Sequence, residues 1–384
     1  MMIDFLFDYT TLRLIWWILL GVLLIAFAVS DGFDLGVGAL LPFVARTDTE
    51  RRVAINTVGP VWEGNQVWFI LGGGAIFAAW PALYAISFSG FYLAMFLVLL
   101  ALILRPVGFK YRSKRESARW RNNWDWALFV GGAVPALIFG VAVGNTLQGV
   151  PFHFTDDLRP IYEGNLFGLL NPLALFCGLV SLAMIVMHGA AWLAFKAEGT
   201  VADRAAAFGP KAALAASGFF ALGGLFIHAG FFGGYEATSP IVWDGPSNPL
   251  YKTVVENDTA WLRNFQSHPL LWLVPLLGVV APLFAALGFR ARMAGLTFLA
   301  SQLAIVCIIA TVGLAMFPFV LPSSSNPGHS LMVFDATSSR LTLRNMLVVT
   351  VIFLPLILVY TAWVYRVLWG KVSEKDVTGD GHAY

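Results

Sequence analysis

Charged residues are scarce in this chain of 384 residues. Only 12% of them are Asp, Glu, Lys or Arg, whereas a soluble domain has about 25%. The net charge is only +2 and the basic residues lie in short loops, which excludes nucleic acid as a partner. Cysteine is scarce too: Cys177 and Cys307 lie inside apolar runs, and no zinc or iron–sulfur spacing occurs. We therefore expect neither a disulfide nor a metal site.

A basic amino-terminal segment and low-complexity sequence are also lacking. Residues 1–9 contain Asp4 and Asp8 but no Lys or Arg, unlike a cleaved signal peptide. We therefore expect the first apolar run to remain as a permanent helix.

Apolar residues dominate instead, at 58% of the chain. A membrane-spanning helix needs about 20 mostly apolar residues. The first apolar segment is long enough to tilt or to break at Asp31-Gly32. In total, nine segments predict an all-α integral membrane protein with nine spans: 11–44, 53–80, 82–105, 124–147, 166–196, 205–233, 268–289, 293–319 and 343–369.

The distribution of basic residues predicts the orientation of these spans. Of the 24 Lys and Arg residues, 18 fall on the side of the C-terminus and 6 on the other side. Cytoplasmic loops carry the excess of Lys and Arg, so we expect the N-terminus outside and the C-terminus in the cytoplasm. The most basic loop, residues 105–121, also suits contact with anionic lipid head groups. Two outside connections, 234–267 and 320–342, are long and should be ordered only where they pack.

A weak internal repeat relates the two halves of the chain. Gly21 precedes Asp31 by ten residues, as Gly178 precedes His188. Spans 1–4 and 5–8 would then be parallel repeats about an axis along the membrane normal. The expected units are two four-helix bundles, 1–147 and 148–342, followed by a ninth helix and a cytoplasmic tail in 343–384.

A polar stretch, residues 59–68, interrupts the second span and contains Glu63. An ionisable group inside a span costs at least about 2.5–3.5 kcal/mol and marks a candidate functional site. Asp31 and Asp34 are three residues apart in the first span, so they share a helix face. All three acids lie roughly 16–22 Å along their helices from the cytoplasmic interface. We therefore predict one proton-handling layer of Asp31, Asp34 and Glu63 inside the bundle, next to Trp62.

The second span adds amides to this layer. Asn56, Glu63 and Gln66 would line one side of a continuous helix. Pro60 cannot donate to the carbonyl of Asn56, which frees an acceptor for a short chain of waters.

Polar groups in a span can also serve only to hold helices together. We favour that explanation for Asn56, Asn65 and Gln66, because neutral amides suffice for it. Three carboxylates in one layer favour proton uptake and release instead. In the first span, Gly32 and Gly36 form a pair of small residues that would let a neighbouring helix approach closely.

Other polar residues have simpler explanations. Asp125 lies at the expected start of the fourth span, where it would complement the helix dipole. His188 and His228 lie within spans but in different leaflets, so they cannot ligate one haem iron together. We expect His188 and His228 to be hydrogen-bonded packing residues. Asp335, followed by hydroxyl residues, is typical of a turn or cap.

An ordered set of motifs resembles subunit II of the cytochrome bd-type quinol oxidases over nearly the whole chain. No single motif is specific, but their order is. The matching segments are Trp62-Glu63-Gly64-Asn65 with its continuation to Trp68, and residues 31–38, 77–81, 89–92, 105–109, 120–122, 124–126, 144–145, 147–152, 316–319 and 335–339.

The resemblance implies nine spans in two four-helix bundles plus one helix, in a bacterial inner membrane. It implies a ubiquinol oxidase complex in which this subunit pairs with subunit I, which carries two b haems and one d haem. The complex would oxidise quinol at the outer side, reduce O₂ to water with cytoplasmic protons, and build a proton-motive force without pumping. A structural quinone in this subunit and a small single-span subunit are further implications, and the lone chain would be inactive.

The resemblance also implies roles for particular residues. The cytoplasmic proton route of the family passes the acid of the Trp-acid-Gly-Asn motif, here Glu63 beside Trp62, with Asp31 and Asp34 supporting the same region. A second proton inlet in some members uses an acid at the position of Lys110 and a C-terminal Tyr, here Tyr384. Lys110 departs from that pattern.

Two other classes of protein remain open from the residues alone. A proton-coupled secondary transporter would also carry acids in mid-membrane and parallel repeats. An independent membrane haem b protein could use His188 or His228 as the single ligand of a five-coordinate haem.

Overall fold

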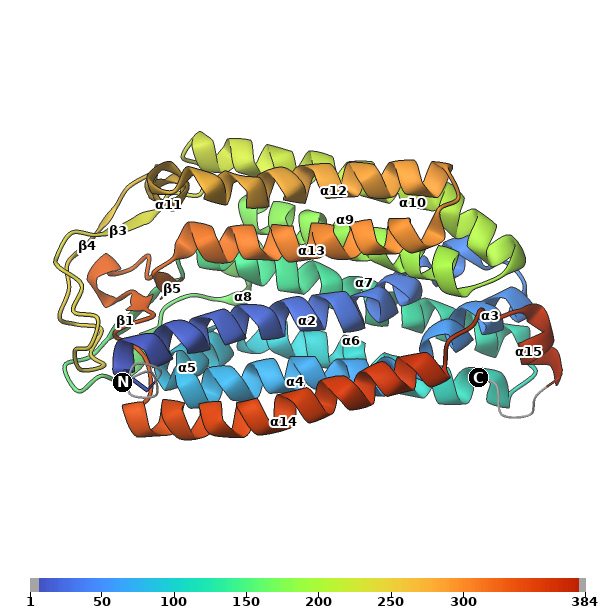
Figure 1. The fold of residues 1–384 in the computed structure, drawn as a ribbon, viewed down its shortest axis with the longest axis horizontal. Coiled ribbons are helices and arrows are strands. Elements are labelled where there is room, and N and C mark those ends of the chain that lie inside the picture. Colours follow the sequence, from blue (N-terminus) through green and yellow to red (C-terminus); the bar gives the residue numbers. More distant parts are fainter. Residues whose placement is uncertain (1–6, 380–384) are drawn as a thin grey trace.

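Long helices that run along one axis make up most of the computed structural model, which describes residues 7–379 (Figure 1). The helices are α2 (Tyr9–Val44), α3 (Asp48–Val58), α4 (Trp62–Ala79), α5 (Pro81–Gly90), α6 (Tyr92–Tyr111), α7 (Ala118–Gln148), α8 (Leu166–Leu169), α9 (Pro172–Lys196), α10 (Gly199–His228), α11 (Arg263–Ser267), α12 (Leu273–Arg290), α13 (Ala294–Met316), α14 (Arg340–Val367) and α15 (Glu374–Gly379). Short 3₁₀ turns are η1 (Arg112–Lys114), η2 (Ala260–Leu262), η3 (Pro269–Trp272) and η4 (Pro327–His329).

Eight helices in the described part of the chain are long and apolar enough to cross a membrane. The prediction of an all-α membrane protein is therefore confirmed. These helices are α2, α6 with η1, α7, α9, α10, α12 with η3, α13 and α14.

The expected second span is not one continuous helix. α3 ends at Val58 and α4 begins at Trp62, because Pro60 has no N–H for the helical ladder. The expected third span also changes direction, between α5 and α6 at Phe91. By contrast, α2 runs unbroken through Asp31 and Gly32, so the considered break at that point does not occur.

Side-chain caps set the start of several helices. Asp8 caps α2 and Asn171 caps α9 by accepting a hydrogen bond from a backbone N–H in the first turn. Thr47 and Glu50 form a capping box at α3. Such caps satisfy N–H groups that have no partner within the helix.

Glycines let α2 lie against its neighbours at backbone distance. A Cβ atom added to Gly36 would be 2.3 Å from the carbonyl oxygen of Ile185 and 2.8 Å from the Cα of Gly189, both in α9. A Cβ atom on Gly132 of α7 would be 2.3 Å from the carbonyl oxygen of Leu35. The predicted close approach at Gly36 is confirmed. Helix α2 thus packs directly on α4, α7, α9 and α13.

The connections at the end where α2 begins carry the strands (Figure 1). In the described residues, six strands form three antiparallel two-stranded sheets. The pairs are β1 (Phe152–Phe154) with β2 (Pro160–Tyr162), β3 (Tyr235–Ala237) with β4 (Val254–Glu256), and β5 (Phe319–Leu321) with β6 (Leu331–Met332); in register, Phe152 faces Tyr162, Tyr235 faces Glu256 and Phe319 faces Met332.

Arg13 of α2, which is fully buried, packs both long connections onto the bundle. Its guanidinium donates to the carbonyl oxygens of Trp243 at 2.7 Å and Gly245 at 2.9 Å. Its Nε donates to the hydroxyl of Thr337 at 2.9 Å. The two connections are therefore held by the same side chain.

Asp335 lies in a turn, as predicted. Its carboxylate accepts a hydrogen bond from the N–H of Met332 at 2.9 Å and pairs with Lys252 at 2.6 Å. Burial raises the pKa of Asp335, although the Lys252 ammonium acts in the opposite direction.

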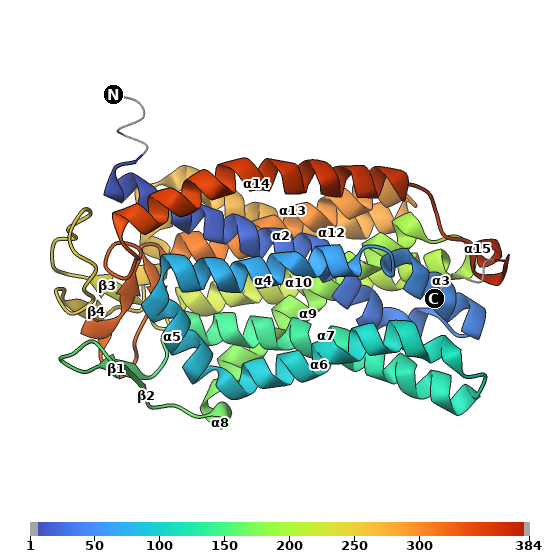
Figure 2. The same cartoon turned by 90° about the horizontal axis from the view of Figure 1, so that it is seen from below.

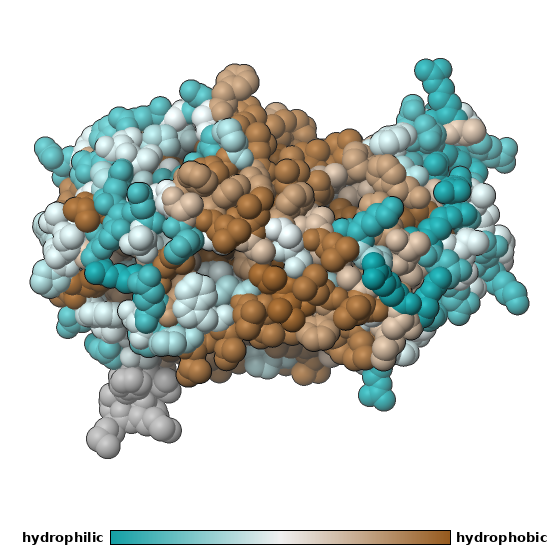
Figure 3. All heavy atoms as spheres, turned by 90° about the horizontal axis from the view of Figure 1, so that it is seen from above, coloured by the Kyte–Doolittle hydropathy of each residue, from teal (hydrophilic) through white to brown (hydrophobic). Residues whose placement is uncertain are grey.

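The surface has a hydrophobic band between two polar ends (Figure 3). Helix α14 contributes strongly to exposed apolar area, since Leu343 is the only one of its residues that is buried within the described chain. Figures 1 and 2 show α14 beside α2 and α4, on one side of the bundle.

Candidate functional site

A buried ion pair joins α2 to α6. Arg105 donates from Nη2 to Oδ1 of Asp31 at 2.7 Å and from Nη1 to Oδ2 at 3.0 Å. Both side chains are at most 2% exposed. This bidentate geometry is the strongest form of a carboxylate–guanidinium contact, and within a membrane it neutralises two charges that would each be costly alone.

Asp34 lies one helical turn away and has a different set of partners. Its Oδ2 accepts a hydrogen bond from Nδ2 of Asn65 in α4 at 2.8 Å. The Oδ1 of Asn65 accepts in turn from the hydroxyl of Tyr365 in α14 at 2.7 Å. A polar chain therefore runs from α2 through α4 to α14.

Trp62 closes one side of this cluster. It is buried, its ring lies 5.9 Å from the guanidinium carbon of Arg105, and its centroid is 5.6 Å from that of Phe109. The aromatic face stabilises the cation and separates the cluster from water.

Glu63 is not part of the buried cluster. Its side chain is exposed on α4, and within residues 7–379 neither Asp31 nor Asp34 forms a hydrogen bond or ion pair with it. The neighbouring residue Asn65 points inward to Asp34 instead. The expected single inward-facing layer of three acids is therefore wrong in its geometry: two acids are buried, and the third faces outward from the same part of the bundle.

The break at Pro60 explains this difference. Asn56 lies in α3, whereas Glu63 and Gln66 lie in α4, so the three do not line one helical face as expected. The Nδ2 of Asn56 donates to the carbonyl of Arg52 in its own helix at 2.8 Å.

The buried cluster has one cation for two carboxyl groups. Oδ1 of Asp34 and Nε of Arg105 are buried and have no hydrogen-bond partner in the described structure. A buried acceptor and a buried donor without partners are costly, and a water molecule could satisfy either of them. One carboxyl oxygen of Asp34 is therefore left open to a further donor, whereas Arg105 engages both oxygens of Asp31.

His188 lies on the opposite face of α2 from this cluster and is fully buried. Its Nε2 donates to the carbonyl oxygen of Val29, with 2.9 Å between them, and its Nδ1 is 2.8 Å from the hydroxyl of Ser301. Its ring stacks on Phe298 at 5.1 Å. The expectation of a hydrogen-bonded packing residue is confirmed for His188.

These contacts do not fit a haem ligand. Both ring nitrogens of His188 are occupied, and His228 ends α10, roughly 30 Å away along the helix axes. Among the described residues, no group of three His, Cys, Asp or Glu side chains is placed to hold a metal ion. Cys177 and Cys307 are free.

Asp125 does not lie in the first turn of a helix, contrary to expectation. Helix α7 begins at Ala118, so Asp125 lies beyond its first turn and is fully buried. It pairs with Arg51 and Arg112, each at 2.5 Å. The helix is longer at its amino end than hydropathy indicated, because polar residues continue it past the apolar segment.

Lys110, at the position of the implied second proton inlet, is exposed in the last turn of α6. Tyr384 lies outside the described residues.

Sequence patterns do not reveal the roles of Arg105 and Tyr365 at this site. They place Arg105 at the start of a basic cytoplasmic loop, yet it lies inside α6. Buried carboxylates in a membrane require a cation, and Arg105 directly follows an apolar run, which was the available signal. Tyr365 gave no signal, because its distance in sequence from Asn65 hides their contact.

Comparisons with known proteins agree with this fold. The family model for cytochrome bd terminal oxidase subunit II matches residues 12–368. The chain is 52% identical over 376 residues to cytochrome bd-I ubiquinol oxidase subunit 2 of Escherichia coli K12, covering 98% of this chain and 99% of that protein. It is 49% identical, with the same coverage, to the probable cytochrome oxidase subunit 2 of Haemophilus influenzae.

A solved structure shares the fold at low sequence identity. The bd oxidase of Geobacillus thermodenitrificans superposes with a TM-score of 0.68 at 16% identity, covering 94% of this chain and 99% of that chain. The apolar helices and these relatives indicate a multi-pass protein of the bacterial inner membrane. The transporter and the independent haem protein considered from sequence are not supported by any of these matches. The chain belongs to the cytochrome bd terminal oxidase subunit II family.

Proposed function

We propose that this chain is subunit II of a bd-type ubiquinol oxidase. It supports the haem-bearing subunit I and helps to conduct cytoplasmic protons for the reduction of O₂ to water, which contributes to the proton-motive force without pumping. The family match supports the identity. The proposed proton route rests on one observation, the buried cluster of Asp31, Arg105, Asp34 and Asn65.

The charges of this cluster support proton binding. One guanidinium balances one carboxylate, and Asp31 takes both of its terminal nitrogens. Among the described residues, the donor that Asp34 accepts from is the neutral amide of Asn65. Because an unpaired carboxylate inside a membrane is costly, the Asp31–Asp34 pair is most stable when it carries one proton. Transfer of that proton and its replacement from the cytoplasm constitute the proposed relay.

Glu63 would join the same proton route from the interface between the two subunits. An acid facing lipid in a membrane-spanning segment is costly, so the outward face of α4 requires a covering partner. That face also exposes Val67 at 42% and Ile70 at 70%, and the adjacent α14 exposes Val359 at 70%. We therefore place subunit I on α4 and α14, with Glu63 between the two chains and the buried acids one helix layer behind it.

The haems of the complex would lie in subunit I, two b and one d, and would carry electrons from quinol to O₂. His188 does not fit a haem ligand, since both of its ring nitrogens are hydrogen-bonded. No step of the proposed relay passes through a haem. A structural quinone and a small single-span subunit remain proposals from the family.

The same proposal specifies the number of spans, their bundles and the sides on which the termini lie. α3 with α4 would form one span and α5 with α6 another, giving nine spans in all. Residues 1–147 and 148–342 would form two four-helix bundles, with α14 as the additional helix in 343–384. The N-terminus would be periplasmic and the C-terminus cytoplasmic.

The test is Glu63→Gln in the assembled complex. Gln has nearly the same shape but cannot carry a proton, so quinol oxidase turnover should fall at least tenfold while assembly and haem content stay at the wild-type level. Glu116→Gln, an exposed acid outside the spans, is the matched control and should leave turnover unchanged.

Each other outcome has a defined meaning. Wild-type turnover in Glu63→Gln would remove Glu63 from the route. Failure of the variant subunit to assemble would assign Glu63 to packing between the subunits. Turnover by the purified lone chain would contradict the requirement for subunit I.

A further inference from the structure

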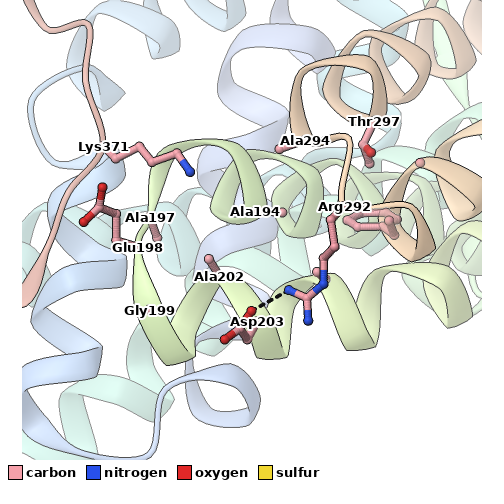
Figure 4. A pocket seen from close by; sticks show the side chains of 13 residues that line it. Ala194, Ala197, Glu198, Gly199, Ala202, Asp203, Arg292, Ala294, Thr297 and Lys371 are labelled. Carbon is pink, nitrogen blue, oxygen red and sulfur yellow. Dashed lines mark hydrogen bonds and ion pairs between the residues drawn. The ribbon is translucent and has the colours of Figure 1, made fainter.

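An open cavity of about 410 Å³ lies where α9 ends and where α10 and α13 begin (Figure 4). Its inner wall is formed by the buried residues Ala197, Ala206, Phe289 and Thr297. None of the residues of the proposed proton route lines it. The cavity is therefore a separate feature, at the end of the bundle opposite the strands (Figure 1).

The rim of the cavity carries two acids and two bases. Arg292 pairs with Asp203 at 2.5 Å. Glu198 and Lys371 are exposed, and Figure 4 marks no hydrogen bond or ion pair between their side chains and the other residues drawn. The rim thus offers one carboxylate and one ammonium group that are both available to a ligand.

Backbone contacts hold these two charges beside one another. The N–H of Val372 donates to the carbonyl of Lys196 at 2.8 Å, and the N–H of Glu198 donates to the carbonyl of Val372 at 3.0 Å. The segment after α14 is thereby attached to the connection between α9 and α10. Lys371 and Glu198 lie on the two attached segments, so their spacing is set by the fold.

Two helix amino ends add to the electrostatics of the site. Neither α10 nor α13 has a side-chain cap at its start, although they are 30 and 23 residues long. Free N–H groups and the helix dipole favour an anion at such a position. The cavity therefore offers Lys371 and Arg292 to an anionic group, and Glu198, which lies beside Lys371, to a cationic group (Figure 4).

Trp369 indicates the depth of the cavity in the membrane. It follows α14 by two residues, is 74% exposed, and its ring lies 5.8 Å from that of Phe195 at the end of α9. Exposed tryptophans of membrane proteins gather at the head-group level. Lys371 lies two residues further on, which places the rim among the lipid head groups.

We propose that this cavity binds the head group of a zwitterionic phospholipid with a primary amine, phosphatidylethanolamine. The phosphate contacts Lys371, Arg292 and the amino ends of α10 and α13. The ammonium group donates to Glu198, which a trimethylated choline head group cannot do because it has no N–H. The acyl chains leave past Trp369 into the bilayer.

The test uses hydrogen–deuterium exchange of the intact protein, in its purified complex, in nanodiscs of phosphatidylcholine with or without phosphatidylethanolamine. The ethanolamine lipid should slow exchange at least threefold in the first turns of α10 and α13. Lys371→Gln should abolish this protection, and Glu198→Gln should make the two lipids equivalent. Lys375→Gln, exposed in α15 and outside the cavity, is the control and should behave as wild type.

Several results would overturn the proposal. Equal exchange in both kinds of nanodisc would show that the amine is not recognised. Stronger protection by phosphatidylglycerol would assign the site to anionic lipids, and the same protection from millimolar inorganic phosphate would assign it to a free anion. Equal losses of protection in Lys371→Gln and Lys375→Gln would show that the protection depends on general surface charge and not on this cavity. The readout is exchange, not oxidase turnover, so it does not depend on the proposed function.

Discussion

Arg105 binds Asp31 through two hydrogen bonds of 2.7 and 3.0 Å, and both side chains are buried between α2 and α6. Removing one partner from a buried ion pair leaves an uncompensated charge, which costs about 3–5 kcal/mol. Arg105→Met should therefore strongly lower the thermal unfolding temperature of the detergent-solubilised complex, measured by differential scanning fluorimetry.

The double variant Asp31→Leu with Arg105→Met is the control for this prediction. It removes both charges, and replacing a buried pair with apolar residues of similar size is often neutral. We expect it to recover most of the lost stability. A double variant as unstable as Arg105→Met alone would show that packing, and not the unpaired charge, causes the loss.

Gly189 of α9 contacts α2 at backbone distance, since an added Cβ atom would lie 2.3 Å from the carbonyl carbon of Gly36. Gly189→Ala should force the two helices apart and cost about 1–3 kcal/mol or more. Gly21→Ala in α2, where no atom outside the local helix backbone lies within 4 Å of the new Cβ, should be neutral or stabilise by about 0.5–1 kcal/mol. Thermal unfolding of both variants tests the difference, and equal effects would contradict the close contact.

The sequence predicted the helical membrane fold and the burial of Asp31 and Asp34, because hydropathy and helical spacing are local properties. It could not predict that Glu63 faces outward. The direction of the Glu63 side chain depends on where helical geometry resumes after Pro60. A continuous helix through Pro60 would place every later side chain at a different angle around the helix axis. Arg105 was missed for a related reason: hydropathy places the end of a span, but only the fold shows that α6 carries this charge inward.

Arg13 joins the connections that contain Trp243, Gly245 and Thr337 to α2. Hydrogen bonds to a charged group contribute about 1.5–3 kcal/mol each, and roughly 1.4 kcal/mol changes an opening equilibrium tenfold. Arg13→Met should therefore raise the rate of limited proteolysis within residues 240–250 at least tenfold.

Arg159 provides the comparison at the same end of the molecule. Its side chain is 80% exposed and, within residues 7–379, forms an ion pair only with Asp157 in the same loop. Exposed ion pairs contribute at most about 1 kcal/mol, so Arg159→Met should leave cleavage within residues 240–250 at the wild-type rate. Equal acceleration in both variants would mean that loss of positive charge, not loss of the buried contacts, exposes the loop.

Glu50 connects the start of α3 to α10 and gives a pH-dependent prediction. Burial alone would raise its pKa, but hydrogen bonds from Arg204, from the backbone N–H groups of Arg46 and Thr47, and from Thr200 outweigh burial and lower the pKa to about 2. The folded chain therefore stabilises the ionised form of Glu50 relative to its protonated form.

The direction of the pH effect follows from this lowered pKa. The ordinary pKa of a glutamate is 4.5, so the stabilisation by Glu50 is fully present above that pH and is lost as the pH falls toward 2. Glu50→Gln should lower the unfolding temperature at pH 7 and pH 5 by the same amount, and the gap to wild type should narrow at pH 3. Glu374→Gln, exposed in α15, should show no gap at any of these pH values. A gap for Glu50→Gln that stays constant down to pH 3 would mean that its hydrogen bonds do not depend on the charge.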